Sequence, residues 1–130
     1  MPEPRSGETG SRVEAGPCRF RRWWSQRVVV EDESMQPTLR PGDRLLVDRR
    51  AYRDRSPRVG ELVVLMDPED PRRWLVKRVA SVDPSTGTVE VRGDAAAVAR
   101  DSRRFGPVPT GALVGRVYRR YFPPERRAEL

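Results

Sequence analysis

Lys77 stands out for its chemistry, because it is the only lysine among the 26 basic residues of the chain. It lies within the largely apolar stretch from Trp74 to Ala80. An arginine guanidinium stays protonated in proteins, whereas a lysine amine can lose its proton once it is removed from water. A neutral amine is a base, so the composition makes Lys77 a candidate general base. The alternative is that an arginine-rich genome leaves a single lysine by chance.

Ser34 is a candidate nucleophile. It stands at the end of a β-type run, just before a turn that contains Pro37. A turn can direct a hydroxyl and backbone N–H groups at one point, as an oxyanion site requires, although a serine in a turn is more often a cap. A serine hydroxyl attacks well only when a base takes its proton. The chain has no histidine, which leaves the carboxylates and Lys77 as bases, and a Ser–Lys pair is a known variant of the catalytic triad.

The composition excludes several other kinds of site. Without histidine there is no Ser-His-Asp or Cys-His catalysis, and with Cys18 as the only cysteine there is no internal disulfide and no zinc cluster. We therefore expect no metal and no other cofactor. The longest apolar runs, Leu62–Met66 and Ala95–Ala99, have five residues, whereas a membrane-spanning helix needs about 20. The net charge of +7 is compatible with binding to nucleic acid or anionic lipid, or with solubility alone.

Short apolar runs separated by turns predict a mainly β fold. The runs are rich in valine and leucine, the turns are rich in proline, glycine and aspartate, and no amphipathic helix competes with them. We expect a small bent or barrel-like antiparallel sheet. The expected strands are Arg27–Val30, Arg44–Asp48, Glu61–Met66, Trp74–Val82, Thr88–Arg92 and Ala112–Tyr118, with turns at 40–43, 67–71 and 83–87.

The expected strand Trp74–Val82 would place Lys77 on the same face as Leu75 and Val79, because side chains alternate along a strand. Both neighbours are apolar, as a dry amine requires. The opposite face, with Trp74 and Val76, is also largely apolar, so the pattern leaves open which face is buried.

Four motifs, in this order, resemble those of signal peptidase I. Ser34-Met35-x-Pro37-Thr38-Leu39 with Gly42-Asp43 resembles its nucleophile box, and Leu75-Val76-Lys77-Arg78-Val79 resembles its lysine box. The other two motifs are Val59-Gly60-Glu61-Leu62-Val63-Val64-Leu65, and Gly93-Asp94 followed by Asp101-Ser102-Arg103 and Phe105-Gly106-Pro107-Val108. The resemblance implies a serine endopeptidase on a mainly β fold, with Ser34 as nucleophile and Lys77 as general base. It also implies that Asp94, Asp101 and Arg103 brace the site.

The resemblance also implies a kind of substrate. Family members bind an extended peptide, and the residues that match its pockets are Val30, Met35, Leu75 and Val76. Short, unanchored relatives resemble the maturation proteases of nickel-type superoxide dismutase, which remove a leader from a cytoplasmic proprotein. The main alternative is a signal peptidase that acts on exported preproteins through peripheral membrane attachment. A nucleic-acid-binding β-barrel is less favoured, because the arginines are spread along the chain and mixed with acidic residues. A self-cleaving repressor is less favoured because residues 1–26 are too short for a DNA-binding domain.

Two positions depart from the family pattern. Asp32, two residues before Ser34, stands where the family often has a serine or glycine, and a carboxylate cannot donate a hydrogen bond to an oxyanion. Ala99 stands where the family has a serine that bonds the lysine. These changes leave an inactive member of the family as an alternative.

The sequence predicts four segments and a cytoplasmic or membrane-peripheral protein. The interleaved aromatic and arginine residues of the second segment would either contact lipid through Phe20, Trp23 and Trp24 or, as we slightly favour, cover one end of the core. The segments are a disordered leader (1–17), a basic-aromatic segment (18–27), a signal-peptidase-like catalytic domain (28–122) and a frayed tail (123–130).

Overall fold

The computed structural model describes residues 23–130, so the predicted leader, and Phe20 with it, lie outside the described residues. Strands dominate the described part of the chain. In order, the elements are β1 (Ser25–Val29), β2 (Arg44–Asp48), β3 (Leu62–Asp67), β4 (Asp70–Asp83), β5 (Thr88–Arg92), the helix α2 (Ser102–Phe105), β6 (Val108–Pro109), the 3-10 turn η2 (Thr110–Ala112), β7 (Leu113–Phe122), the 3-10 turn η3 (Pro124–Arg126) and β8 (Ala128–Glu129).

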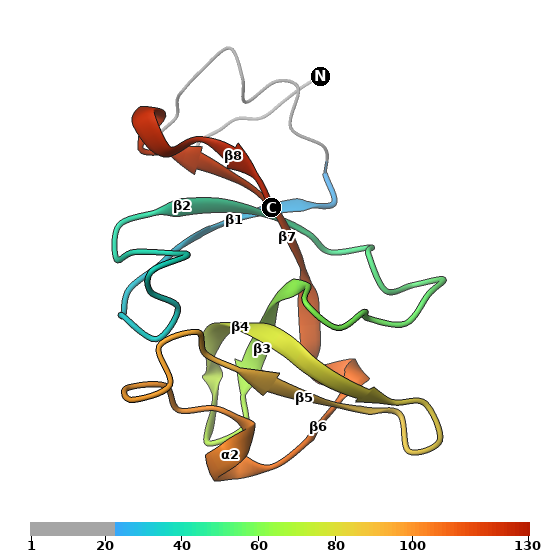
Figure 1. Ribbon diagram of the computed structural model, residues 1–130. Coiled ribbons are helices and arrows are strands. Elements are labelled where there is room, and N and C mark those ends of the chain that lie inside the picture. Colours follow the sequence, from blue (N-terminus) through green and yellow to red (C-terminus); the bar gives the residue numbers. More distant parts are fainter. Residues whose placement is uncertain (1–22) are drawn as a thin grey trace.

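All strands described belong to one antiparallel sheet. Its order is β1-β2-β7-β3-β4-β5-β6, and β8 pairs with β7 beside this path. Within the described residues the sheet does not close, because β1 and β6 stand at its two ends. Figure 1 shows β1, β2 and β8 in one half of the molecule and β3 to β6 in the other. The expected mainly β fold with a bent antiparallel sheet is confirmed.

The long strand β7 joins the two halves. Its first residues pair with β3 and its later residues pair with β2, and both pairings contain register shifts typical of β-bulges. Bulges bend a strand and increase its twist. At Gly115 of β7 an added Cβ would lie 2.3 Å from the carbonyl oxygen of Asp48 on β2. The close approach of β2 to β7 therefore requires glycine at this position.

Two hydrophobic cores lie on opposite faces of β3. Leu62 and Val64 belong to the first core and Val63 and Leu65 to the second, and all four side chains are buried. A strand buried on both faces has a continuous apolar sequence instead of an alternating one, which explains this run. The first core also contains Val30, Met35, Leu39, Leu45, Val47 and Val117, and the second contains Leu75, Val79, Val89, Val91 and Val108.

The structure corrects the predicted tail and one predicted turn. The tail is not frayed, because β8 pairs with β7 and the Arg126 guanidinium donates to the buried carboxylate of Asp43 over 2.6 Å. The turn predicted at 67–71 is shorter, since Asp67 already pairs with Asp70 across a tight hairpin. Pro71, at the edge of this hairpin, does not end β4. A proline has no N–H, and the strand needs no hydrogen-bond donor at this position.

Candidate active site

Ser34 is held by a turn whose apolar residues are anchored in the first core. Met35 and Leu39 are 1% and 0% exposed, and the backbone N–H of Leu39 donates to the carbonyl of Met35 over 3.0 Å. The N–H of Gln36 donates to the carbonyl of Glu33 over 3.1 Å. These contacts hold the turn against the first core. Ser34 itself is 6% exposed.

Lys77 is held by the regular backbone of β4. It pairs with Val63 on β3, and its side chain lies on the same buried face as Leu75 and Val79. The lysine side chain is itself only 2% exposed. Burial lowers the pKa of the Lys77 amine below its ordinary value of 10.5, while the negative charges of Asp32 and Asp101 act in the opposite direction. The sequence pattern left open which face of this strand is buried. The structure shows that it is the face that carries Lys77.

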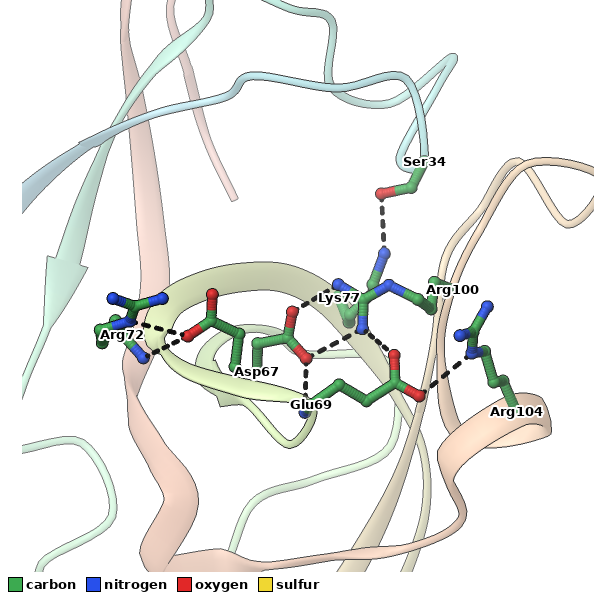
Figure 2. Close-up of polar contacts among 8 residues, drawn as sticks. Ser34, Asp67, Glu69, Arg72, Lys77, Arg100 and Arg104 are labelled. Carbon is green, nitrogen blue, oxygen red and sulfur yellow. Dashed lines mark hydrogen bonds and ion pairs between the residues drawn. The ribbon is translucent and has the colours of Figure 1, made fainter.

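The two side chains meet between the halves of the molecule. Lys77 Nζ donates a hydrogen bond to Ser34 Oγ over 2.8 Å, across 43 positions of sequence. Figure 2 shows the serine pointing from its turn toward the lysine that extends from β4. An amine that has lost its proton can accept the hydroxyl proton through the same contact. The geometry is thus that of a nucleophile with a base in hydrogen-bond reach.

Asp94 connects the turn that carries Ser34 to the strand that carries Lys77. Thr38 Oγ1, four residues after the serine, donates to Asp94 Oδ2 over 2.7 Å. Arg78, the residue after the lysine, donates to the two carboxylate oxygens over 2.9 Å and 2.8 Å. The bonds from Arg78 above all lower the pKa of the Asp94 carboxyl, so the carboxylate stays charged between its two partners.

Gly93 lies directly against Ser34. A Cβ added there would be 2.6 Å from the carbonyl oxygen of Ser34 and 2.4 Å from the Cβ of Ala99. The backbone N–H of Ala95 donates to that same Ser34 carbonyl over 2.9 Å. The segment that follows β5 therefore packs on the turn through backbone contacts that no larger residue at position 93 would permit.

Asp101 holds this segment in place. Its buried carboxylate accepts from the Gly93 N–H over 2.8 Å, and Arg103 donates to it from its backbone and from its guanidinium. Burial alone would raise the pKa of Asp101, but the bonds from Arg103 and Gly93 lower it to about 2. The charged Asp101 supports Gly93, and Gly93 in turn supports Ser34.

Arg100 brings a positive charge to the lysine side of the site. Its guanidinium donates to Asp67 and to Glu69, each over 2.9 Å, and Figure 2 shows this cluster beside Lys77. Burial is the largest cause that lowers the pKa of the Lys77 amine, and the positive charge of Arg100 lowers it further. Within residues 23–130, the Ser34 hydroxyl is the only hydrogen-bond partner of that amine.

Two cavities share Ser34 in their walls. The first, of about 380 Å³, lies between β1 and β4 and is lined by all four predicted substrate-binding residues, Val30, Met35, Leu75 and Val76. The second, of about 420 Å³, has Lys77 and Arg100 in its wall. Ser34 therefore borders both cavities.

Comparison with known proteins shows the family of the chain. Residues 18–86 match the family described as signal peptidase, peptidase S26. The chain belongs to the signal peptidase family. It is 40% identical over 111 positions to the mitochondrial ATP-independent inner membrane protease subunit 1b of Arabidopsis thaliana, covering 69% of this chain and 66% of that protein. It is 35% identical over 116 positions to the mitochondrial inner membrane protease subunit 1 of Schizosaccharomyces pombe, covering 75% and 74%.

The two departures from the signal peptidase pattern have different surroundings. Ala99 packs against Gly93, so a methyl group stands where the family would place a hydroxyl. Asp32 is in contact with Ser34, since its Oδ1 accepts from the backbone N–H of Ser34 over 3.0 Å.

The sequence had not assigned a role to Thr38, Arg78 or Arg100, although the first two stand inside the signal peptidase motifs. For Arg78 the alternation of side chains along β4 is a usable signal. It places this arginine on the face opposite to the buried lysine, where it can contact other segments. Within residues 23–130 no helix is long and apolar enough to span a membrane, and no group of three histidine, cysteine or acidic residues is arranged to hold a metal ion.

Proposed function

We propose that this member of the signal peptidase family is a serine endopeptidase that works through a Ser34–Lys77 dyad. The observation that carries the proposal is the 2.8 Å contact between a buried amine and a serine hydroxyl in the wall of two cavities. A buried lysine without a carboxylate partner costs stability. A neutral amine in this place is explained by its use as a base.

The dyad supplies each proton transfer that peptide hydrolysis needs. Neutral Lys77 Nζ takes the proton of Ser34 Oγ as the oxygen bonds to the carbonyl carbon. The C–N bond then breaks, and the Lys77 ammonium gives its proton to the leaving amine. Lys77 next takes a proton from water, the hydroxide attacks the ester, and Ser34 leaves with the proton from the lysine.

The pairing of β1 and β4 in the sheet supports an extended substrate. Within residues 23–130, β1 pairs only with β2, and β5 pairs with β4 only from Arg78 onward. Residues of β1 and of the part of β4 that precedes its pairing with β5 line the first cavity. A peptide strand in this cavity can bond to a backbone edge, while its side chains enter apolar pockets. Val30, Met35, Leu75 and Val76 would favour small apolar side chains before the cleaved bond.

The substrate that follows is an N-terminal leader or signal peptide on a proprotein. The resemblance to maturation proteases of nickel-type superoxide dismutase makes that proprotein the first to test. Exported preproteins are the second candidate, and the exposed ring of Trp23 favours it. Trp23 is 77% exposed, and the guanidinium of Arg50 lies 5.5 Å from its ring centre. An aromatic ring beside an arginine suits the headgroup layer of a membrane.

The test is to incubate the full chain with both kinds of preprotein and to map new N-termini by mass spectrometry. Ser34→Ala is the matched control, since it removes one oxygen from a side chain that is already buried. We expect one defined new N-terminus with the wild type and none with the control. Cleavage that persists in Ser34→Ala would contradict the dyad. Salt-dependent binding to single-stranded nucleic acid, without cleavage, would favour the β-barrel alternative. Cleavage of preproteins only in the presence of anionic vesicles would favour the membrane-peripheral alternative.

A further inference from the structure

Asp32 occupies the hydrogen-bond donor that a serine peptidase needs free. Its Oδ1 accepts from the backbone N–H of Ser34 over 3.0 Å. When Ser34 Oγ attacks a peptide carbonyl, the negative charge develops on an oxygen beside that N–H, and a donor placed there stabilises the transition state. A donor that is already bonded to a carboxylate is not available. Asp32 must therefore leave the N–H before, or as, the tetrahedral intermediate forms.

The charge of Asp32 also acts on the base. It raises the pKa of the Lys77 amine against the larger effect of burial, and Lys77 in turn lowers the pKa of Asp32. Asp32 and Lys77 both line the second cavity, and the other charged groups in its wall are Glu33, Arg73 and Arg100. Both effects of Asp32 oppose the reaction, because one engages the donor and the other favours the protonated amine.

Arg73 on β4 offers the carboxylate a second position. Arg73 and Asp32 line both cavities at Ser34, and the charge of Arg73 is among the causes that lower the pKa of Asp32. Both side chains are exposed, so neither has to leave a packed core to move. A substrate carbonyl that enters beside Ser34 would displace the carboxylate toward this guanidinium.

We propose that Asp32 is a positioning residue whose carboxylate holds the backbone N–H of Ser34, the oxyanion donor, in a resting state. When a peptide binds, the carboxylate moves to Arg73 and the N–H becomes available. The inference rests on the proposed peptidase function. It assigns to Asp32 a restraint on the rate, where a turn-capping role would only support the fold. Aspartate is also a common cap of such turns, so the test has to separate these roles.

Three substitutions at Asp32 make this separation. Asp32→Ala removes the acceptor, Asp32→Ser removes the charge but can still cap the turn and donate to an oxyanion, and Asp32→Asn keeps an acceptor without its charge. We expect the pH-independent limit of kcat/KM to rise about tenfold in the alanine and serine variants, the effect of about one hydrogen bond. The asparagine variant should rise less, because a neutral acceptor still holds the N–H. Asp54→Asn, on an exposed loop outside both cavities, is the control for net charge.

Arg73→Gln tests the second position of the carboxylate. We expect it to lower kcat/KM in the wild-type background and to have little effect in Asp32→Ala, where no carboxylate has to move. An equal loss in both backgrounds would overturn the role of Arg73 as the partner of Asp32. Rates in Asp32→Ala and Asp32→Ser that do not exceed the wild type would overturn the proposal as a whole.

A second readout needs no cleavage. In an ¹⁵N-labelled protein, the amide signal of Ser34 should shift as Asp32 is protonated below its ordinary pKa, and this shift should be missing in Asp32→Asn. If no variant cleaves any substrate while the amide titrates as expected, the peptidase proposal fails and the contact stands. If the wild type cleaves and the amide does not titrate, the Asp32 proposal fails and the peptidase stands.

Discussion

The turn that carries Ser34 and the strand that carries Lys77 are held by different forces. Lys77 is positioned by the pairing of β4 with β3 and by apolar neighbours in the second core. Ser34 is positioned by Met35 and Leu39 in the first core and by polar contacts from the segment after β5. Lys77 thus depends on regular structure, whereas Ser34 depends on contacts between residues far apart in the sequence. Substitutions in the two regions should therefore fail in different ways.

The largest effect is expected at the base itself. Lys77→Ala and Lys77→Arg should each lower kcat/KM by at least about 10⁴-fold, because alanine has no base and a guanidinium does not lose its proton. The measurement is cleavage of a proprotein under conditions in which circular dichroism shows both variants folded. Substantial activity in either variant would remove Lys77 from the mechanism.

Gly93 tests the nucleophile side. Gly93→Ala forces a methyl group against the carbonyl of Ser34, so the turn must shift. A displacement near 1 Å can cost about 100-fold in rate, and we expect a loss of that order in kcat. Gly111→Ala is the matched control, since an added Cβ there meets no atom within 4 Å and the backbone needs no glycine. Equal activities in the two variants would mean that the turn does not depend on this packing.

Asp94 tests the link between the regions. Asp94→Asn should lower stability by about 1–3 kcal/mol, because the charged bonds from Arg78 weaken, and should lower kcat/KM about tenfold. The pKa of Lys77 should change little, since its burial on β4 does not use Asp94. Glu129→Gln breaks an exposed ion pair with Arg119 and should cost less than about 1 kcal/mol. Urea unfolding and cleavage rates measure the contrast, and similar losses in both variants would contradict the role of Asp94.

Removal of the buried amine should give a gain in stability. Lys77→Met should raise stability at pH 7 by about 1–4 kcal/mol, because it removes a buried amine. In the unfolded chain the amine is protonated below its ordinary pKa of 10.5, whereas burial lowers the pKa in the folded state. The wild type therefore loses stability as the pH falls below 10.5, so the advantage of methionine should shrink as the pH rises from 7 toward 10.5 and level off above it. Urea unfolding from pH 7 to 11 measures this difference, and a wild type that is more stable at pH 7 would contradict it.

The strands and the motifs were predictable because each is written in a short stretch of sequence. The bounds of β2 and β5 agree with the predicted runs, and the buried face of β4 is one of the two that alternation allowed. The contacts of Asp94 with Thr38 and Arg78 were not predictable, since they join segments up to 56 positions apart. The order of the tail was not predicted for the same reason, because Arg126 in the tail bonds to Asp43, which lies 83 positions earlier in the sequence. Local pattern predicts elements, while the polar contacts between them depend on the completed fold.

The most direct measurement is the titration of Lys77 itself. Because it is the only lysine of the chain, lysine labelled with ¹³C gives a single side-chain signal, and its shift with pH reports the pKa of the amine without any substrate. We predict a midpoint below 10.5 in the wild type, as the burial of the amine requires. A midpoint at or above 10.5 would mean that the amine stays charged at neutral pH, and would contradict its role as the base for Ser34.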